Sequence, residues 1–268
     1  MEKKMENKGD LTLNSIHVPD SLGVRYAILP GDPERVLTIA KFLENARPVS
    51  VHREYTSYVG EIDGEPVLAI STGMGGPSTA ICVEELYAIG VKTVIRLGTC
   101  GGMQEEIEAG DRVVVSGAIR QEGTTNQYVY PEFPAVADLD VVQALREASA
   151  RESGNTWVGV VQSKDSLYGQ HAPQRMPVAE DLEARYRAWI KAGCLGSEME
   201  ASTVFIVSQI RKMRAGCLLN VIWNKEREKA GFPAQVSSDM TASIRAVVEA
   251  IRILIRKDRE NSGIADEK

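Results

Sequence analysis

Residues 92–102, KTVIRLGTCGG, contain the transition that decides the fold class. Their first part, Lys92 to Ile95, is apolar and β-branched and predicts a buried strand. An arginine, a hydroxyl and three glycines follow, and they predict a loop whose backbone N–H groups can approach a ligand closely. Ligands of open α/β sheets bind beyond the carboxyl ends of the strands, and arginine offers a planar set of donors to phosphate or carboxylate oxygens. We therefore expect this loop to bind an oxyanion.

The sequence on either side of this loop alternates between extended and helical patterns. The proline-led turn at 30–33, PGDP, and the glycine-rich turn at 73–78, GMGGPS, each precede a helical pattern. Strands are predicted at 24–29, 55–59, 67–71, 93–97, 112–117, 158–162 and 217–222, with a hairpin turn at Asp63-Gly64. Helices are predicted at 33–42, 78–89, 201–213 and 238–256. Because no linker or repeat interrupts this alternation, we expect one α/β domain with three layers, α/β/α.

Composition excludes several classes of function. Hydrophobic residues make up 43% of the 268 residues and charged residues 25%, which is typical of a globular protein with a core. A net charge of −6 disfavours broad binding of nucleic acid. We expect no secretory signal in the polar start and no membrane partner, because no apolar run has spanning length. The cysteines lie far apart without a CxxC pair, so we expect reduced thiols and a cytoplasmic protein; they are Cys82, Cys100, Cys194 and Cys217.

Two further arginines accompany predicted turns. Arg35 lies one turn into the helix that begins at Pro33, so it can face the turn at Gly31, next to a helix N-terminus that suits an anion. Arg53 lies in a short polar stretch between two predicted strands. Either one alone is more typical of a surface ion pair, whereas Arg96 joins a buried strand to a glycine loop and is a stronger candidate for an anion ligand.

Five stretches in register resemble a known family. They are LPGDPER (29–35), HRE (52–54), STGMGGPS (71–78), RLGT (96–99) and SEME (197–200). Together they are similar to the signature stretches of the nucleoside phosphorylase superfamily, and EFPAVAD (132–138) resembles its uridine-specific branch. The resemblance implies that superfamily's fold, with a central mixed, partly barrel-like sheet. We expect the domain at 17–258, between a flexible segment at 1–16 and a frayed tail at 259–268.

The resemblance implies that inorganic phosphate is a substrate. Gly31, Arg35, Arg96 and Thr99 would hold it, and Arg53 would reach in from a neighbouring subunit. Phosphate is a weak nucleophile unless it is positioned, and guanidinium groups with backbone donors can position it. The expected reaction is phosphorolysis of a nucleoside to the free base and ribose 1-phosphate, without an organic cofactor.

The resemblance also implies a ribose site. Glu200 would bind the 2′ and 3′ hydroxyls, Met199 would lie against the sugar, and Glu198 would support both, with Thr99 nearby. A carboxylate at the sugar hydroxyls helps an oxocarbenium-like charge to develop. His17 would contact the 5′ hydroxyl across a subunit boundary, so we expect at least a dimer. The bacterial-type proteins that the sequence resembles are hexamers.

The expected base site departs from the usual pattern at 166–175, SLYGQHAPQR. Uracil leaves as an anion, which a glutamine amide and an arginine can bind. Either Gln170 or Gln174 can be that glutamine, and we favour Gln170 with Arg175. Leu167 replaces a phenylalanine that often packs on the base. The resemblance also places Cys100, Gly101 and Lys225 at the base, and the catalytic residues would be Arg96, Glu200, Gln170 and Arg175.

Asn224 favours a pyrimidine substrate. Purine-specific members of the superfamily carry an aspartate at this position, which can protonate the purine, whereas an asparagine cannot act as an acid. Lys225 replaces an arginine of many uridine-specific members, and Arg227 could substitute for it. We expect phosphorolysis of uridine, with deoxyuridine or thymidine as further substrates, in pyrimidine salvage. The alternatives are a purine-specific phosphorylase on the same fold and a non-catalytic nucleoside-binding or sensing protein.

A monovalent cation is the one metal that the resemblance suggests. Glu54, Met74 and Ser78 match positions around such an ion, K⁺ in particular, at the dimer interface of some relatives. Ordinary polar contacts within a turn explain these residues equally well. No His, Cys and Asp cluster has zinc-like spacing, and 73–76 is not a dinucleotide fingerprint.

Overall fold

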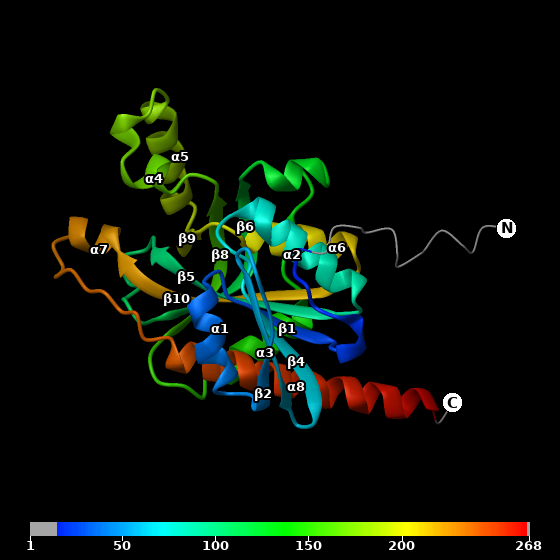
Figure 1. The fold of residues 1–268 in the computed structure, drawn as a ribbon. Helices are drawn as coiled ribbons and strands as arrows, with labels where there is room; N and C mark the ends of the chain where they lie inside the picture. Colours follow the sequence, from blue (N-terminus) through cyan, green and yellow to red (C-terminus); the bar gives the residue numbers. More distant parts are fainter. Residues whose placement is uncertain (1–14, 267–268) are drawn as a thin grey trace.

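The computed structural model describes residues 15–266, and within them ten strands join in one mixed sheet (Figure 1). The strands are β1 (Tyr26–Leu29), β2 (Glu44–His52), β3 (Tyr55–Ile62), β4 (Glu65–Ile70), β5 (Thr93–Gly102), β6 (Arg112–Gln121), β7 (Ala135–Val136), β8 (Thr156–Lys164), β9 (Gly196–Glu198) and β10 (Arg214–Asn224). The α-helices are α1 (Pro33–Ala40), α2 (Gly76–Ala88), α3 (Leu139–Ser149), α4 (Leu167–His171), α5 (Ala179–Lys191), α6 (Ala201–Ile210), α7 (Lys225–Lys229) and α8 (Thr241–Asp266). Short 3₁₀ turns lie at Asp20–Leu22, Thr124–Gln127 and Pro173–Arg175.

Five of the strands close into a barrel. β5 pairs with β10, β10 with β6, β6 with β8, β8 with β9, and β9 returns to β5. The pairings of β10 with β6 and of β9 with β5 are antiparallel and the other three are parallel. From β5 the sheet continues outward through β1, β4, β3 and β2. The expected mixed, partly barrel-like sheet is therefore confirmed.

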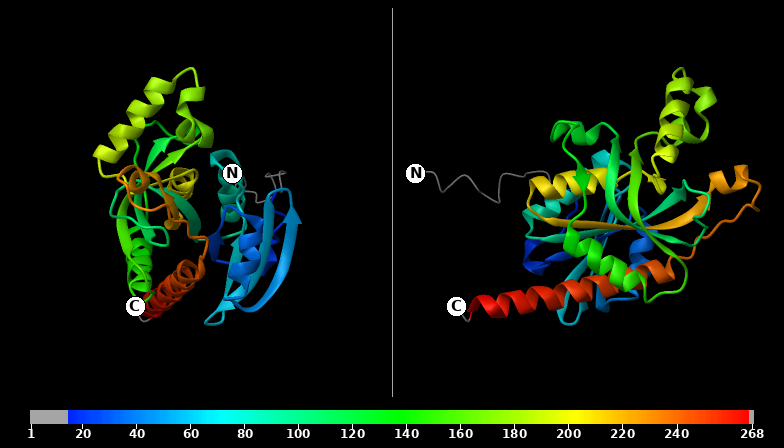
Figure 2. Two further views of the ribbon diagram at one scale, coloured as in Figure 1. Left: turned by 90° about the vertical axis from the view of Figure 1, so that its left-hand side faces the viewer. Right: turned by 180° about the vertical axis from the view of Figure 1, so that it is seen from behind.

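Helices cover both faces of the sheet (Figure 2), and each face has its own apolar core. One core contains the apolar side chains of α2 and of α6. α6 is buried along most of its length because it lies between the sheet and a neighbouring helix. The other contains the apolar sides of α1, α3 and α8. The predicted three-layer α/β/α arrangement follows from these two cores. No helix among the described residues has the length and apolar character needed to cross a bilayer.

The predicted glycine loop after Arg96 is strand instead of loop. Leu29, the last residue of β1, pairs with Arg96, so β1 ends where the glycine stretch of β5 begins. Residues 97–102 continue as strand because β10 runs alongside them and β9 pairs with the last two. The interpretation of 98–102 as a loop was wrong because these barrel pairings are not visible in the local sequence.

Other differences concern ends and exposed elements. α8 continues through Asp266, whereas the pattern predicts an end near Arg256 and fraying from 259. Of the segment expected to be flexible, residues 1–14 lie outside the described part, while Ser15 and Ile16 are held because their N–H groups donate to the carboxylate of Glu85. Three further elements, α3, α5 and β2, were not predicted from the sequence. α5 has no buried residue and β2 is mostly exposed, so neither carries the apolar periodicity of a buried element.

Candidate active site

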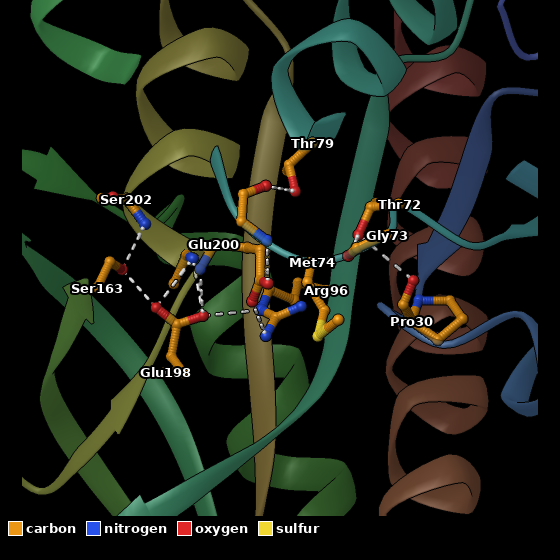
Figure 3. Close-up of polar contacts among 12 residues, drawn as sticks. Pro30, Thr72, Gly73, Met74, Thr79, Arg96, Ser163, Glu198, Glu200 and Ser202 are labelled. Carbon is orange, nitrogen blue, oxygen red and sulfur yellow. Dashed lines mark hydrogen bonds and ion pairs between the residues drawn. The ribbon is translucent and has the colours of Figure 1, made fainter. Parts of the chain in front are cut away.

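Two turns meet at the edge of the sheet where β1 and β4 end (Figure 3). The N–H of Thr72, after β4, donates to the carbonyl of Pro30, after β1, at 2.9 Å. A Cβ on Gly31 would lie 3.2 Å from the carbonyl oxygen of Gly73, so the close approach of the two turns favours glycine at position 31. β1, β4 and β5 are parallel, which brings Arg96 of β5 to the same edge.

Arg96 lies between two glutamates at this edge and is only 4% exposed (Figure 3). Its Nε donates to Glu198 at 3.0 Å, and its Nη2 lies 2.5 Å from a carboxylate oxygen of Glu200. Burial alone would lower the pKa of Arg96, but the carboxylates of Glu200 and Glu198 outweigh it and raise the pKa. A Cβ on Gly98 would lie 2.7 Å from Nη2 of Arg96, so glycine two residues along the strand leaves room for the guanidinium.

Glu198 organises the start of α6. It is buried at the end of β9, and its carboxylate accepts the N–H groups of Glu200 at 2.8 Å and of Ala201 at 2.9 Å. Ser163 of β8 donates its hydroxyl to the same carboxylate. These contacts satisfy N–H groups that a helix N-terminus leaves unpaired. Glu198 therefore fixes the position of Glu200 and of Arg96 and has little capacity left for a ligand.

Glu200 faces the start of α2 as well as Arg96. One carboxylate oxygen accepts the N–H of Gly75 at 2.6 Å, and Gly75 is the residue that precedes α2, with a φ of +89°. Burial raises the pKa of Glu200, while Arg96 acts in the opposite direction. The carboxyl group of Glu200 is thus held next to a guanidinium and at the positive end of a helix, where it can accept hydrogen bonds from sugar hydroxyls.

The remaining residues expected at phosphate and ribose lie at different depths. Arg35, on α1, is partly exposed and lies 3.9 Å from Asp32. Burial lowers its pKa, Asp32 raises it, and Arg96 contributes a repulsion, which places the two guanidiniums in the same electrostatic neighbourhood. Thr99 is half-buried on β5, opposite Asn220 of β10. Met199, between the two glutamates in sequence, is half-buried.

His17 and Arg53 lie together on the surface. Both are exposed, and the ring of His17 stacks on that of His52, the neighbour of Arg53, at 4.0 Å between centroids. Arg53 lies in the turn between β2 and β3 with a φ of +53°. The two residues expected to act across a subunit boundary thus share one surface region.

A cavity of about 480 Å³ opens beside this site, under α4 and α5. It contains four of the expected base-binding residues or their alternatives, namely Gly101, Gln170, Gln174 and Lys225. Its other lining residues are Gly102, Gln121, Gln162, Lys164, Asp165, Ser166, Gly169, His171, Pro173, Leu182, Glu183, Tyr186, Arg187, Trp223 and Lys229. The placement of the cavity at the ends of β5, β8 and β10 suits a flat ring next to the sugar site.

Three other residues expected at the base lie outside the lining of this cavity. Cys100 is buried on β5, Leu167 is 44% exposed at the start of α4, and Arg175 is exposed in the 3₁₀ turn that follows. Gln170 lies next to the residue that precedes Glu198, because its Oε1 accepts a hydrogen bond from the hydroxyl of Ser197 at 2.8 Å. That contact leaves the amide N–H groups of Gln170 for a ligand. Base binding by Arg175 stays a prediction, and Arg175 is not among the residues that line the cavity.

Lys164 and Gln162 line the cavity and were missed in the sequence analysis. Lys164 is 5% exposed, and its Nζ donates to Ser197 at 2.8 Å. Gln162 is also buried, and its Oε1 has no hydrogen-bond partner within residues 15–266. The signal was a lysine at the end of an apolar strand, VGVVQSK, where a solvated charge is not expected.

Asn224 and Arg227 are committed to the loop before β6. The amide of Asn224 donates to the carbonyls of Gln104 and Ile107 at 2.8 and 2.7 Å, and its oxygen accepts the N–H groups that begin α7. Arg227 donates to the carbonyl of Glu105 and pairs with Glu108. The suggestion that Arg227 replaces a base-binding arginine is therefore at odds with its position, since it points to this loop and does not line the cavity.

The residues expected at a monovalent cation lie around one glycine turn. A Cβ on Gly73 would lie 2.9 Å from the side chain of Glu54 and 3.2 Å from the hydroxyl of Ser78, so both approach the same turn. Met74 follows in that turn, and its carbonyl accepts the hydroxyl of Ser78 at 3.4 Å. Carboxylate, hydroxyl and carbonyl oxygens are suitable ligands for a hard cation. In residues 15–266 no three His, Cys, Asp or Glu side chains form a metal cluster.

Comparison with known proteins gives a consistent assignment. The model of the Phosphorylase superfamily matches residues 25–256. The chain is 46% identical to a uridine phosphorylase of Treponema pallidum, over 87% of this chain and 90% of the relative. It is 41% identical to a uridine phosphorylase of Thermococcus kodakarensis, over 88% and 84% of the two chains. It is also 35% identical to a guanosine phosphorylase of Halorubrum lacusprofundi, over 85% and 93%.

Proposed function

Since this chain belongs to the phosphorylase superfamily, we propose that it cleaves uridine with inorganic phosphate and gives uracil and ribose 1-phosphate. The observation that carries the proposal is the buried guanidinium of Arg96 held between Glu198 and Glu200. A buried arginine beside a sugar-binding carboxylate suits a reaction in which an anion attacks a sugar carbon. Similarity to curated uridine phosphorylases over most of the chain supports the choice of substrate.

In this reaction a phosphate oxygen forms a bond to C1′ while the bond from C1′ to N1 of the base breaks. Arg96 and Arg35 hold the phosphate together with Gly31 and Thr99. Glu200 binds the 2′ and 3′ hydroxyls, and its negative charge favours the positive charge that develops on the sugar. Phosphate attacks from a fixed position, which removes much of the entropic cost of the encounter.

The cavity beside Glu200 supports a pyrimidine over a purine. Gln170 offers its amide N–H groups there, and Lys225 lies at the rim. The amide of Asn224 is bonded to backbone groups and offers no acid to protonate a purine. Deoxyuridine and thymidine are further candidate substrates, and the family resemblance favours a dimer-based assembly, of six subunits in all, that acts in cytoplasmic pyrimidine salvage. The shared surface of His17 and Arg53 supports an intersubunit role for both.

A phosphate-dependent assay tests the proposal. Purified protein is incubated with uridine, deoxyuridine, thymidine, adenosine, inosine or guanosine, with and without phosphate, and the release of free base is measured. We expect release from uridine that depends on phosphate. Turnover of purine nucleosides without uridine would assign the protein to the class of its guanosine-cleaving relative. Binding of nucleosides without any release of base would favour a sensor.

A further inference from the structure

Lys164 occupies an unusual position for a lysine. It is the last residue of β8, is 5% exposed, and is among the residues that line the cavity assigned to the base. Side chains alternate along a strand, so Gln162 and Lys164 share the face towards the cavity, whereas Ser163 between them bonds to Glu198. A buried ammonium carries a large desolvation cost unless a partner or a function compensates for it.

The contacts of Lys164 leave part of its hydrogen-bonding capacity for a ligand. An ammonium has three donors, and the hydrogen bond found for it among the described residues goes to Ser197 at 2.8 Å. Ser197 in turn donates its hydroxyl to Oε1 of Gln170, which orients the amide of Gln170. Burial lowers the pKa of Lys164, while Glu198 and Glu200 act in the opposite direction. Lys164 and Gln170 thus present donors to the same cavity.

We propose that Lys164 is a catalytic residue that binds a carbonyl oxygen of the departing uracil. The proposal rests on the proposed function and adds the residue that stabilises the negative charge of the leaving base. When the bond from C1′ to N1 breaks, its electron pair stays on N1 and is delocalised onto the carbonyl oxygens of the ring. Lys164 donates a hydrogen bond to one of these oxygens, phosphate forms the new bond to C1′, and the uracil anion takes a proton from water after release.

This role gives Lys164 the function that was expected of Arg175. Lys164 lines the cavity, whereas Arg175 does not. An anionic base needs a positive donor that is close and dehydrated, because electrostatic interactions are strongest where water is excluded. Arg175 is exposed outside the lining, and Lys225 is only partly buried at the rim. Lys164 is the most deeply buried of these three cations.

The alternative role for Lys164 is structural, as a positive charge that offsets Glu198 and Glu200. The two roles differ in how the rate depends on the leaving base. 5-Fluorouracil is a better leaving group than uracil because fluorine withdraws electrons from the ring. A residue that stabilises the leaving anion matters less for 5-fluorouridine, whereas a structural residue affects both substrates equally.

The experiment compares kcat for uridine and 5-fluorouridine in wild type, Lys164→Met, Lys164→Arg and Lys191→Met. Lys191, exposed at the end of α5, is the matched lysine outside the cavity. We expect Lys164→Met to lower kcat about 100-fold with uridine, as the loss of other donors to a developing anion does. With 5-fluorouridine we expect it to lower kcat only about 10-fold. Lys164→Arg should keep the wild-type ratio between the two substrates, and Lys191→Met should match wild type in both rates.

The outcomes separate this inference from the proposed function. If wild type releases neither base, the proposed function fails. If wild type is active and Lys164→Met lowers kcat by the same factor with both substrates, or does not lower it, the proposal that Lys164 stabilises the leaving uracil is overturned. Should Lys164→Met fail to fold, as judged by its melting curve, Lys164→Gln takes its place: a loss of kcat by the same factor with both substrates, or no loss, overturns the proposal.

Discussion

At the scale of single residues, the site is a balanced group of buried charges. Arg96 and Lys164 are positive, Glu198 and Glu200 are negative, and all four are 5% exposed or less. Each charge would be costly alone, but the ion pairs of Arg96 and the electrostatic attraction between Lys164 and the glutamates compensate for the loss of water. Such a group is stable and also ready to receive an anionic substrate, because its donors are already fixed.

Replacing Arg96 tests both properties. Arg96→Met removes the guanidinium proposed to hold phosphate and leaves two buried carboxylates without their ion pairs. We expect phosphate-dependent release of base to fall by at least about 1,000-fold and the free energy of unfolding to fall by about 3–5 kcal/mol. Steady-state kinetics and denaturant titration measure the two effects.

Arg211→Met is the matched control for this substitution. Arg211 forms a more exposed pair with Glu84 at 2.7 Å, so its loss should leave turnover unchanged and cost under about 1 kcal/mol. The double variant Arg96→Met with Glu200→Gln should recover stability without recovering turnover. Normal consumption of phosphate by Arg96→Met would remove the basis of the proposed reaction.

The pKa of Glu200 predicts a dependence of stability on pH. Because burial raises this pKa in the folded protein, folding favours the protonated carboxyl. Its contribution to stability is complete below the ordinary carboxyl range, about 4.3, and is lost as the pH rises through the raised value. The free energy of unfolding of wild type minus that of Glu200→Gln should therefore decrease as the pH rises from 4.

Denaturant titrations of both proteins at a series of pH values measure this difference. Other titrating groups are common to the two proteins and cancel. A difference that stays constant or increases with pH would mean that Arg96 outweighs burial at this carboxylate.

At the scale of elements, the junction of β9 and α6 determines the site. A three-residue strand closes the barrel, and its last side chain, Glu198, caps the helix that begins three residues later. The barrel, the helix start and the pair with Arg96 thus depend on one carboxylate. A helix start of this kind is usually worth about 1 kcal/mol, but here a buried ion pair is added.

Replacing Glu198 should therefore cost more than replacing an ordinary cap. We expect Glu198→Ala to lower the free energy of unfolding by about 3–5 kcal/mol. Asp138→Ala is the control, since Asp138 caps α3 through the N–H groups of Asp140 and Val141 and should cost about 1 kcal/mol. Denaturant titration compares the two, and equal losses would show that Glu198 acts as a simple cap.

At the scale of the whole molecule, the sheet edge collects groups from five separate segments. Phosphate-binding candidates follow β1 and lie on β5, the carboxylate proposed to bind ribose precedes α6, and the cavity proposed for the base lies at the ends of β8 and β10. Arg53 and His17 lie together on an exposed surface region, and the proposed function assigns their contribution to another copy of the chain.

Subunit mixing tests whether Arg53 acts in a neighbouring copy. Arg53→Ala and Arg96→Met should each be nearly inactive alone. If the sites are shared within a symmetric dimer, random mixing places both defects in one site of a mixed dimer and leaves the other site intact. Co-expression should then restore roughly a quarter of wild-type activity. Activity no greater than the sum of the two inactive variants would show that Arg53 acts within its own chain.

The parts of the fold that local sequence predicts are those with a buried apolar pattern. The strands around Val94 and Leu68 and the helices at 33–40 and 76–88 were recognised because periodicity, Pro33 and the glycine turns are local signals. α5 was missed because it has no buried side, and β2 because it is exposed. α3 had a signal, since Asp138 precedes an apolar pattern at 141, 144, 145 and 148.

The sequence by itself determined the class of fold and the family, because the stretches that indicate them are short and contiguous and their chemistry can be read locally. It also predicted residues for phosphate and ribose, and those roles stay predictions. Only the tertiary structure decided which side chains share a cavity. It extended β5 through its glycines, bound the amide of Asn224 to the backbone, left Arg175 exposed and placed Lys164 beside Gln170. The reason is physical: strand pairing and burial depend on residues distant in the chain, and these determine which polar groups remain for a ligand.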